Sequence, residues 1–147
     1  HAHFYLGESL MNLEQFPEAS SHFQTVLDLS TRGPLLKTAS PLASRTVFRL
    51  GLVEYRVGQF TSALEVWQGF KARFPESSLH GKVGLGRGCT HYRLRQYELA
   101  SQQFSKWTRD DQVGTHAQYW LGLTWAAQEK WRQAAEQFVE AFKGALS

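Results

Sequence analysis

A fixed pattern of small and aromatic side chains occurs four times along the chain. Each time, a glycine is followed by an aromatic residue nine positions later, an alanine at twelve and a second aromatic residue at sixteen. The glycines are Gly7, Gly51, Gly88 and Gly122; the first aromatic residues are Phe16, Phe60, Tyr97 and Trp131; the alanines are Ala19, Ala63, Ala100 and Ala134; the second aromatic residues are Phe23, Trp67, Phe104 and Phe138. The alanine and the second aromatic residue are four apart, so they share one helical face. Because glycine and alanine let two helices approach closely, the pattern predicts repeated helix–turn–helix units.

The pattern predicts eight helices in four pairs. The first helices are expected near residues 1–13, 42–57, 77–94 and 112–128, and their partners near 16–30, 60–73, 97–108 and 131–145. Successive glycines are 44, 37 and 34 residues apart, so the first repeat contains an insertion. We assign the insertion to a loop at 31–41, because Gly33, Pro34 and Pro41 lie there. No segment alternates between apolar and polar residues as a strand would, so the predicted class is all-α.

The chain resembles the tetratricopeptide repeat family, whose unit has Leu-Gly in its first helix, alanine and phenylalanine in its second, and proline near its end. Leu6-Gly7, Leu50-Gly51 and Leu121-Gly122 fit this pattern, whereas Arg87-Gly88 departs from it. Pro75 fits the proline that ends the second repeat. The resemblance implies a right-handed α-solenoid in a single domain, 1–147. Its repeats are expected at about 1–30, 42–75, 77–110 and 112–146.

Composition and charge narrow the classes of protein. The chain has 147 residues, the size of one domain, and a net charge of +3 with interspersed signs. That charge fits a solvated surface better than nucleic-acid binding. The single cysteine cannot form an intrachain disulfide, and no apolar stretch reaches the 18 residues of a membrane span. Because the chain opens at His1 within a helical pattern, we expect it to be a fragment of a longer chain.

The residues that could support catalysis or metal binding lack the required spacing. No two histidines are four residues apart, and Cys89 and His91 are two apart, on different sides of a helix. The glycine-rich run 81–88 lacks the Gly-Lys-Ser/Thr ending of a phosphate-binding loop. We therefore predict no catalytic, cofactor-binding or metal-binding residues. The run 81–88 is interpreted as a helix weakened by glycine, with a frayed or bent start.

In the tetratricopeptide repeat fold the first helices line a concave face. The resemblance implies that groove residues lie three positions before each glycine and one, four and five positions after it, which includes Phe4 and Cys89. The predicted partner-binding groove consists of Phe48, Leu52, Tyr55, Arg56, Leu85, Tyr92, Arg93, Tyr119 and Leu123. This set is apolar and aromatic with a basic edge, which suits a peptide with some acidic groups. The alternative is that the tyrosines pack against the neighbouring repeat and the arginines face water.

The helix expected at the C-terminal end is apolar on more sides than a capping helix needs. Val139 and Leu146 add to the apolar positions expected on its packing face, whereas a capping helix presents a polar outer side. Either a further repeat or self-association would cover this surface.

Together these features predict a non-enzymatic scaffold that binds an unidentified peptide or protein segment in its groove. The alternative is a regulatory or docking module of a larger enzyme or of a multi-repeat assembly protein. The phrases Phe74-Pro75-Glu76-Ser77 and Tyr119-Trp120-Leu121-Gly122 resemble those of bacterial cell-envelope members of the family. This similarity favours a soluble bacterial protein of the periplasm or the cytoplasm.

Overall fold

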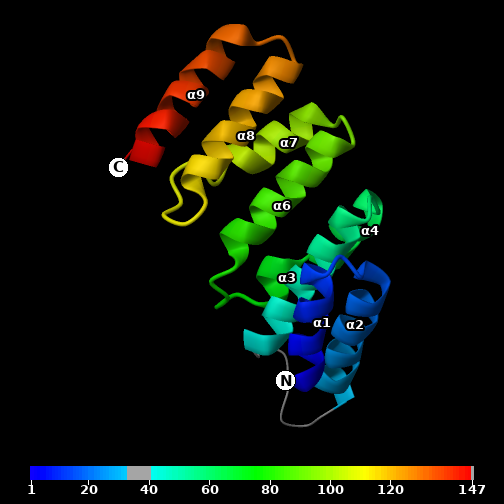
Figure 1. Ribbon diagram of the computed structural model, residues 1–147. Coiled ribbons are helices and arrows are strands. Elements are labelled where there is room, and N and C mark those ends of the chain that lie inside the picture. Colours follow the sequence, from blue (N-terminus) through cyan, green and yellow to red (C-terminus); the bar gives the residue numbers. More distant parts are fainter. Residues whose placement is uncertain (33–40, 147) are drawn as a thin grey trace. The chain divides into compact units, whose positions relative to one another are not determined.

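Helices dominate the computed structural model, which describes residues 1–32 and 41–146, and no strand occurs in these ranges. The helices are α1 (Ala2–Asn12), α2 (Phe16–Arg32), α3 (Pro41–Arg56), α4 (Phe60–Trp67), α5 (Phe70–Arg73), α6 (His80–Arg93), α7 (Tyr97–Ser105), α8 (Gly114–Ala127) and α9 (Trp131–Leu146) (Figure 1). None of these helices combines the length and the apolar character needed to span a bilayer. They form two compact units, His1–His80 and Gly81–Ser147. The predicted all-α repeat fold is confirmed.

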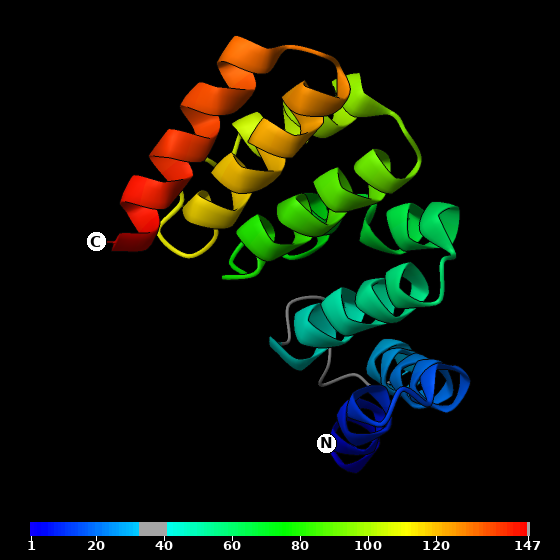
Figure 2. The ribbon, with the colours of Figure 1, turned by 45° about the horizontal axis from the view of Figure 1, so that its top comes forward.

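The first unit is built from helix pairs joined by short turns. α1 packs against α2, α3 packs against α4, and α2 also contacts α3 (Figure 2). The core between these helices consists of Phe4, Ala19, Phe23, Val26, Leu50 and Val53. A Cβ atom on Gly7 would lie 2.8 Å from the ring of Phe23. The glycine therefore leaves room for the ring of Phe23 between the two helices, as the sequence pattern predicts.

The second unit repeats this arrangement. α8 lies beside α9 and also contacts α7 (Figure 2). The ring of Phe104 is fully buried and would lie 2.5 Å from a Cβ atom on Gly88. The ring of Phe138 would lie 2.7 Å from a Cβ atom on Gly122. Glycine and aromatic residue thus form the same interhelical contact in both units.

The turn between the two helices of each repeat has a common backbone conformation. The residue seven positions after the repeat glycine has a positive φ: 59° at Glu14, 85° at Gly58, 60° at Arg95 and 61° at Glu129. The N–H of the next residue donates to a carbonyl five residues earlier, as from Gln15 to Leu10 at 2.8 Å. This is the Schellman closure, in which a left-handed residue ends the helix. The sequence analysis did not identify it, because only one of the four positions is glycine.

We expect Gly58→Ala to lower the free energy of unfolding by about 1–2 kcal/mol, the cost of a left-handed conformation for a residue with a Cβ atom. Apart from Gly58 and its two chain neighbours, no residue comes within 4 Å of the position that this Cβ would occupy, so the loss reflects the backbone conformation. Gly58→Asn is the control and should lose less, because asparagine tolerates this conformation better. Urea unfolding followed by circular dichroism measures both variants. An alanine variant as stable as the parent would contradict the assigned turn.

The structure corrects several predicted helix bounds. The helix expected over 60–73 is divided into α4 and α5, because Gly69 between them adopts a left-handed conformation with a φ of 67°. α6 starts at His80 rather than near residue 77 and is continuous to Arg93, so the expected frayed or bent start is not observed. α2 extends to Arg32 and α3 begins at Pro41, and residues 33–40 of the expected loop lie outside the described residues.

Candidate protein-interaction surfaces

Four of the predicted groove residues lie on α3 in the first unit. Phe48, Leu52 and Tyr55 are half-buried, whereas Arg56 is exposed. The ring of Tyr55 meets the ring of Phe60 edge-on, with centroids 5.6 Å apart. This contact with α4 orients the tyrosine, and part of its surface remains accessible to a partner.

The arginines of α3 contact the first repeat. Arg49 Nε lies 2.9 Å from Glu8 Oε1. Arg56 Nη2 lies 4.0 Å from Glu14 Oε1, and its guanidinium lies 5.6 Å from the centre of the Phe16 ring. Of the two arginines in the basic edge predicted from the sequence, Arg56 is therefore partly balanced by Glu14. An exposed pair at 4.0 Å contributes little to stability, so an acidic partner group can compete for Arg56.

The other five predicted residues belong to the second unit. Leu85, Tyr92 and Arg93 lie on α6, and Tyr119 and Leu123 lie on α8. Both leucines and Tyr92 are half-buried, and Arg93 is exposed. Tyr119 is 50% exposed, and one side of its ring contacts the ring of Phe138 with centroids 5.8 Å apart. Of the two aromatic residues in this set, Tyr119 therefore offers more surface to a partner.

Trp120 connects the aromatic side chains of the second unit. Its ring lies 5.5 Å from that of Tyr92, 6.1 Å from that of Phe104 and 6.3 Å from that of Tyr119. Tyr92 also meets Tyr97 edge-on at 5.5 Å, so its ring packs within this cluster. The sequence analysis did not identify Trp120, because the residue two positions before the repeat glycine differs in type from one repeat to the next.

Two residues at predicted groove positions are buried instead. Phe4 is fully buried, its ring contacts Phe23, and the guanidinium of Arg45 covers it at 4.7 Å from the ring centre. Cys89 is also buried, and burial raises the pKa of its thiol to about 12, which keeps the thiol protonated at neutral pH. In residues 1–32 and 41–146, no three His, Cys, Asp or Glu side chains are placed to hold a metal ion. Phe4 and Cys89 therefore act in packing.

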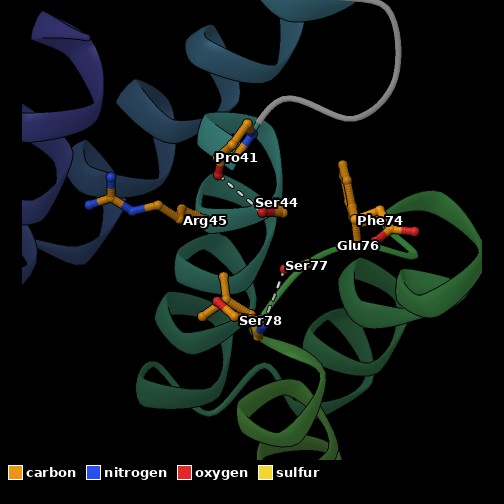
Figure 3. Close-up of a pocket in the computed structure, with 8 residues that line it drawn as sticks. Pro41, Ser44, Arg45, Phe74, Glu76, Ser77 and Ser78 are labelled. Atoms are coloured by element: carbon orange, nitrogen blue, oxygen red, sulfur yellow. Dashed lines mark hydrogen bonds between the residues drawn. The ribbon is translucent and has the colours of Figure 1, made fainter.

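A cavity of about 440 Å³ lies in the first unit beside the start of α3, and no sequence motif indicated it (Figure 3). It is lined by Pro41, Ser44, Arg45, Phe74, Glu76, Ser77, Ser78 and Leu79. The Ser44 hydroxyl donates to the carbonyl of Pro41 at 3.0 Å, and Ser77 Oγ accepts from the N–H of Leu79 at 3.2 Å (Figure 3). These two hydroxyls form local turn contacts, so they do not by themselves indicate a ligand.

Comparison with known families matches both units. A family model for the tetratricopeptide repeat covers residues 4–78 and 85–146. The chain belongs to the tetratricopeptide repeat family. This family's fold is a protein-interaction fold, built here from the glycine and aromatic contacts of each repeat. Comparison with curated protein sequences found no match.

Several solved tetratricopeptide repeat structures resemble this chain. MamA from Desulfovibrio magneticus RS-1, residues 41 to the end, has a TM-score of 0.77 at 20% identity, over 96% of this chain and 72% of that one. YrrB, described as having an unusual peptide-binding site, has a TM-score of 0.73 at 20% identity, over 97% and 66%. The Rap conjugation gene regulator of plasmid pLS20, solved in complex with the Phr* peptide, has a TM-score of 0.76 at 16% identity, over 97% and 40%. At these identities the similarity is one of fold.

Proposed function

We propose that this protein is a non-enzymatic scaffold that binds a peptide or an extended protein segment. The proposed contact residues are Phe48, Leu52, Tyr55 and Arg56 in the first unit and Leu85, Tyr92, Arg93, Tyr119 and Leu123 in the second. The observation that most favours this function is Tyr119, a large aromatic side chain that is half exposed on a first helix. Tyrosine and arginine are enriched where binding energy concentrates. The peptide-binding descriptions of YrrB and of the Rap–Phr* complex support the same class of ligand.

The chemistry of the surface suggests what the peptide contains. Leu52 and Tyr55 offer apolar contact area beside the exposed cation of Arg56, and Arg93 supplies a second exposed cation on α6. Such surfaces favour apolar or aromatic side chains interspersed with Asp or Glu. Since Tyr55 and Tyr92 also pack against aromatic neighbours, replacing them would disturb the fold as well as the surface. Tyr119 is therefore the better position for a test.

We expect Tyr119→Ala to weaken peptide binding by about tenfold or more, because it truncates an aromatic anchor. A random peptide library displayed on phage is selected on the immobilised chain, and enriched peptides are measured by fluorescence anisotropy. Leu99→Ala is the matched control, because Leu99 is similarly exposed but lies on α7. Both variants should retain the parent's helicity and melting temperature within a few degrees.

Two results would contradict this proposal. A selection that enriches no peptide above the bare support would argue against peptide binding. Peptides that bind Tyr119→Ala, Leu52→Ala and the parent equally would place the binding surface elsewhere. Enriched peptides without acidic residues would reject only the assigned role of Arg56 and Arg93.

A further inference from the structure

One side of α9 is apolar and uncovered by the described residues. Trp131 and Phe142 are each 65% exposed, and Val139 and Leu146 are also exposed. These positions follow the spacing of one helical face over the whole of α9. The opposite edge of the apolar surface, at Ala134 and Ala141, is buried. We call Trp131, Val139, Phe142 and Leu146 the α9 stripe.

A second uncovered apolar surface lies on α1. Tyr5 and Leu6 on α1 and Leu13, directly after its end, are exposed, and we call these three residues the α1 stripe. On α3 and α8, which each follow another repeat of the same unit, the residue equivalent to Leu6 is buried. Leu6 is 47% exposed, whereas its equivalents Leu50 on α3 and Leu121 on α8 are 6% and 2% exposed. The α1 stripe therefore resembles a surface against which the second helix of another repeat packs.

The α9 stripe is the matching kind of surface. Within the first unit, α2 packs against α3, and Phe16 and Leu27 of α2 lie against a core that contains Leu50 of α3. Trp131 and Phe142 occupy the same repeat positions as Phe16 and Leu27, nine and twenty residues after the repeat glycine. The two stripes are thus the two halves of a junction that the chain already forms internally.

We propose that a second copy of this chain covers the α9 stripe, with α9 of one molecule packed against α1 of the next. A second copy is the expected partner, because the α9 stripe and the α1 stripe correspond to the two sides of the α2–α3 junction. The contact joins two different surfaces, so a copy joined at one end still has a free stripe at the other and further copies can add. Self-assembly of this kind goes beyond the proposed peptide binding and does not depend on it.

The size of the α9 stripe indicates how tight the contact is. At 65% exposure, Trp131 and Phe142 offer roughly 100–150 Å² each, from typical aromatic side-chain areas. With Val139 and Leu146 the stripe supplies about half of the roughly 800 Å² that each partner buries in a standard interface. We therefore expect reversible association that depends on protein concentration.

The test uses sedimentation velocity on the chain and on single variants over a wide range of concentration. Phe142→Glu disables the α9 stripe, and Leu6→Glu disables the α1 stripe. Each variant alone should lose association by at least about tenfold, because a carboxylate would be buried without a partner. An equimolar mixture of the two variants should form a dimer and stop there, because one functional stripe of each kind remains. Leu99→Glu, at an exposed position on α7, should associate like the parent.

Three outcomes would overturn the proposal. The parent chain could stay monomeric at every concentration, which would leave the α9 stripe to a different partner. Leu6→Glu and Leu13→Glu could both associate like the parent, which would indicate that α9 pairs with α9. The mixture of Phe142→Glu and Leu6→Glu could remain monomeric although both variants show the parent's helicity, which would reject the contact between α9 and α1.

Discussion

Replacing Trp67 by alanine is expected to lower the free energy of unfolding of the first unit by about 3–5 kcal/mol, the usual cost of removing a fully buried large aromatic side chain. Trp67 is completely buried at the end of α4, and its ring covers Gly51 of α3. Its Nε1 atom donates a hydrogen bond to the carbonyl of Phe48 at 3.3 Å. The variant loses this contact area, leaves a cavity and removes one hydrogen bond to the carbonyl of Phe48.

The prediction for Trp67 is checked by urea unfolding followed by circular dichroism. Trp67→Phe should lose less than Trp67→Ala, because the phenyl ring still fills part of the space over Gly51. Gln68→Ala is the adjacent control, and since Gln68 is exposed its change should stay within about 0.5 kcal/mol. A loss below about 1 kcal/mol for Trp67→Ala would mean that the α3–α4 contact does not stabilise the first unit in the way we infer.

The repeat contacts could be predicted from the sequence because a close approach of helices restricts residue type severely. Phe23, Trp67 and Phe104 are fully buried, and each lies over the glycine sixteen positions before it. A Cβ atom at Gly7 or Gly88 would collide with the ring, so the glycine is a direct signature of the contact. The all-α class and the pairing of helices follow from this signature.

The turns and helix interruptions could not be predicted, since they depend on backbone conformation with little restriction of residue type. Glu14, Arg95 and Glu129 adopt a left-handed conformation that glycine favours, and nothing in their side chains indicates it. Gly69 does carry the glycine signal, but the repeat pattern predicted a single second helix over 60–73. In the structure the left-handed conformation of Gly69 separates α4 from α5.

The sequence predicted which helix faces carry the candidate site. It did not predict the individual side-chain contacts on those faces. Phe4 and Phe48 share a repeat position, yet Phe4 is fully buried in the core beside Phe23, and Arg45, 41 residues away in the chain, lies over its ring. The pairing of Arg49 with Glu8 likewise joins distant positions. Such contacts depend on side-chain reach across helices, which a repeat register does not encode. Whether Tyr119 and its neighbours bind a partner stays a prediction.

Replacing Gly84 by alanine is expected to destabilise the second unit by up to about 2 kcal/mol, although alanine is the better helix former. A Cβ atom on Gly84 would collide with Nε1 of the Trp107 indole ring. Overpacking of this kind typically costs 1–3 kcal/mol, which exceeds the gain of about 1 kcal/mol from helix propensity. The glycine that looks like a weakness in the sequence of α6 is thus expected to stabilise the unit through its contact with the loop after α7.

A double-mutant cycle with Trp107→Leu separates the two effects. In the Trp107→Leu background the ring is gone, so Gly84→Ala should become neutral or stabilising by up to about 1 kcal/mol, as helix propensity alone dictates. The coupling between the two positions should then amount to about 1–3 kcal/mol in urea unfolding. Lys82→Ala, at an exposed position of the same helix, should change stability by no more than about 0.5 kcal/mol. A Gly84→Ala variant that is more stable than the parent with Trp107 intact would show that the indole ring moves aside, and the glycine would then be a true weak point of α6.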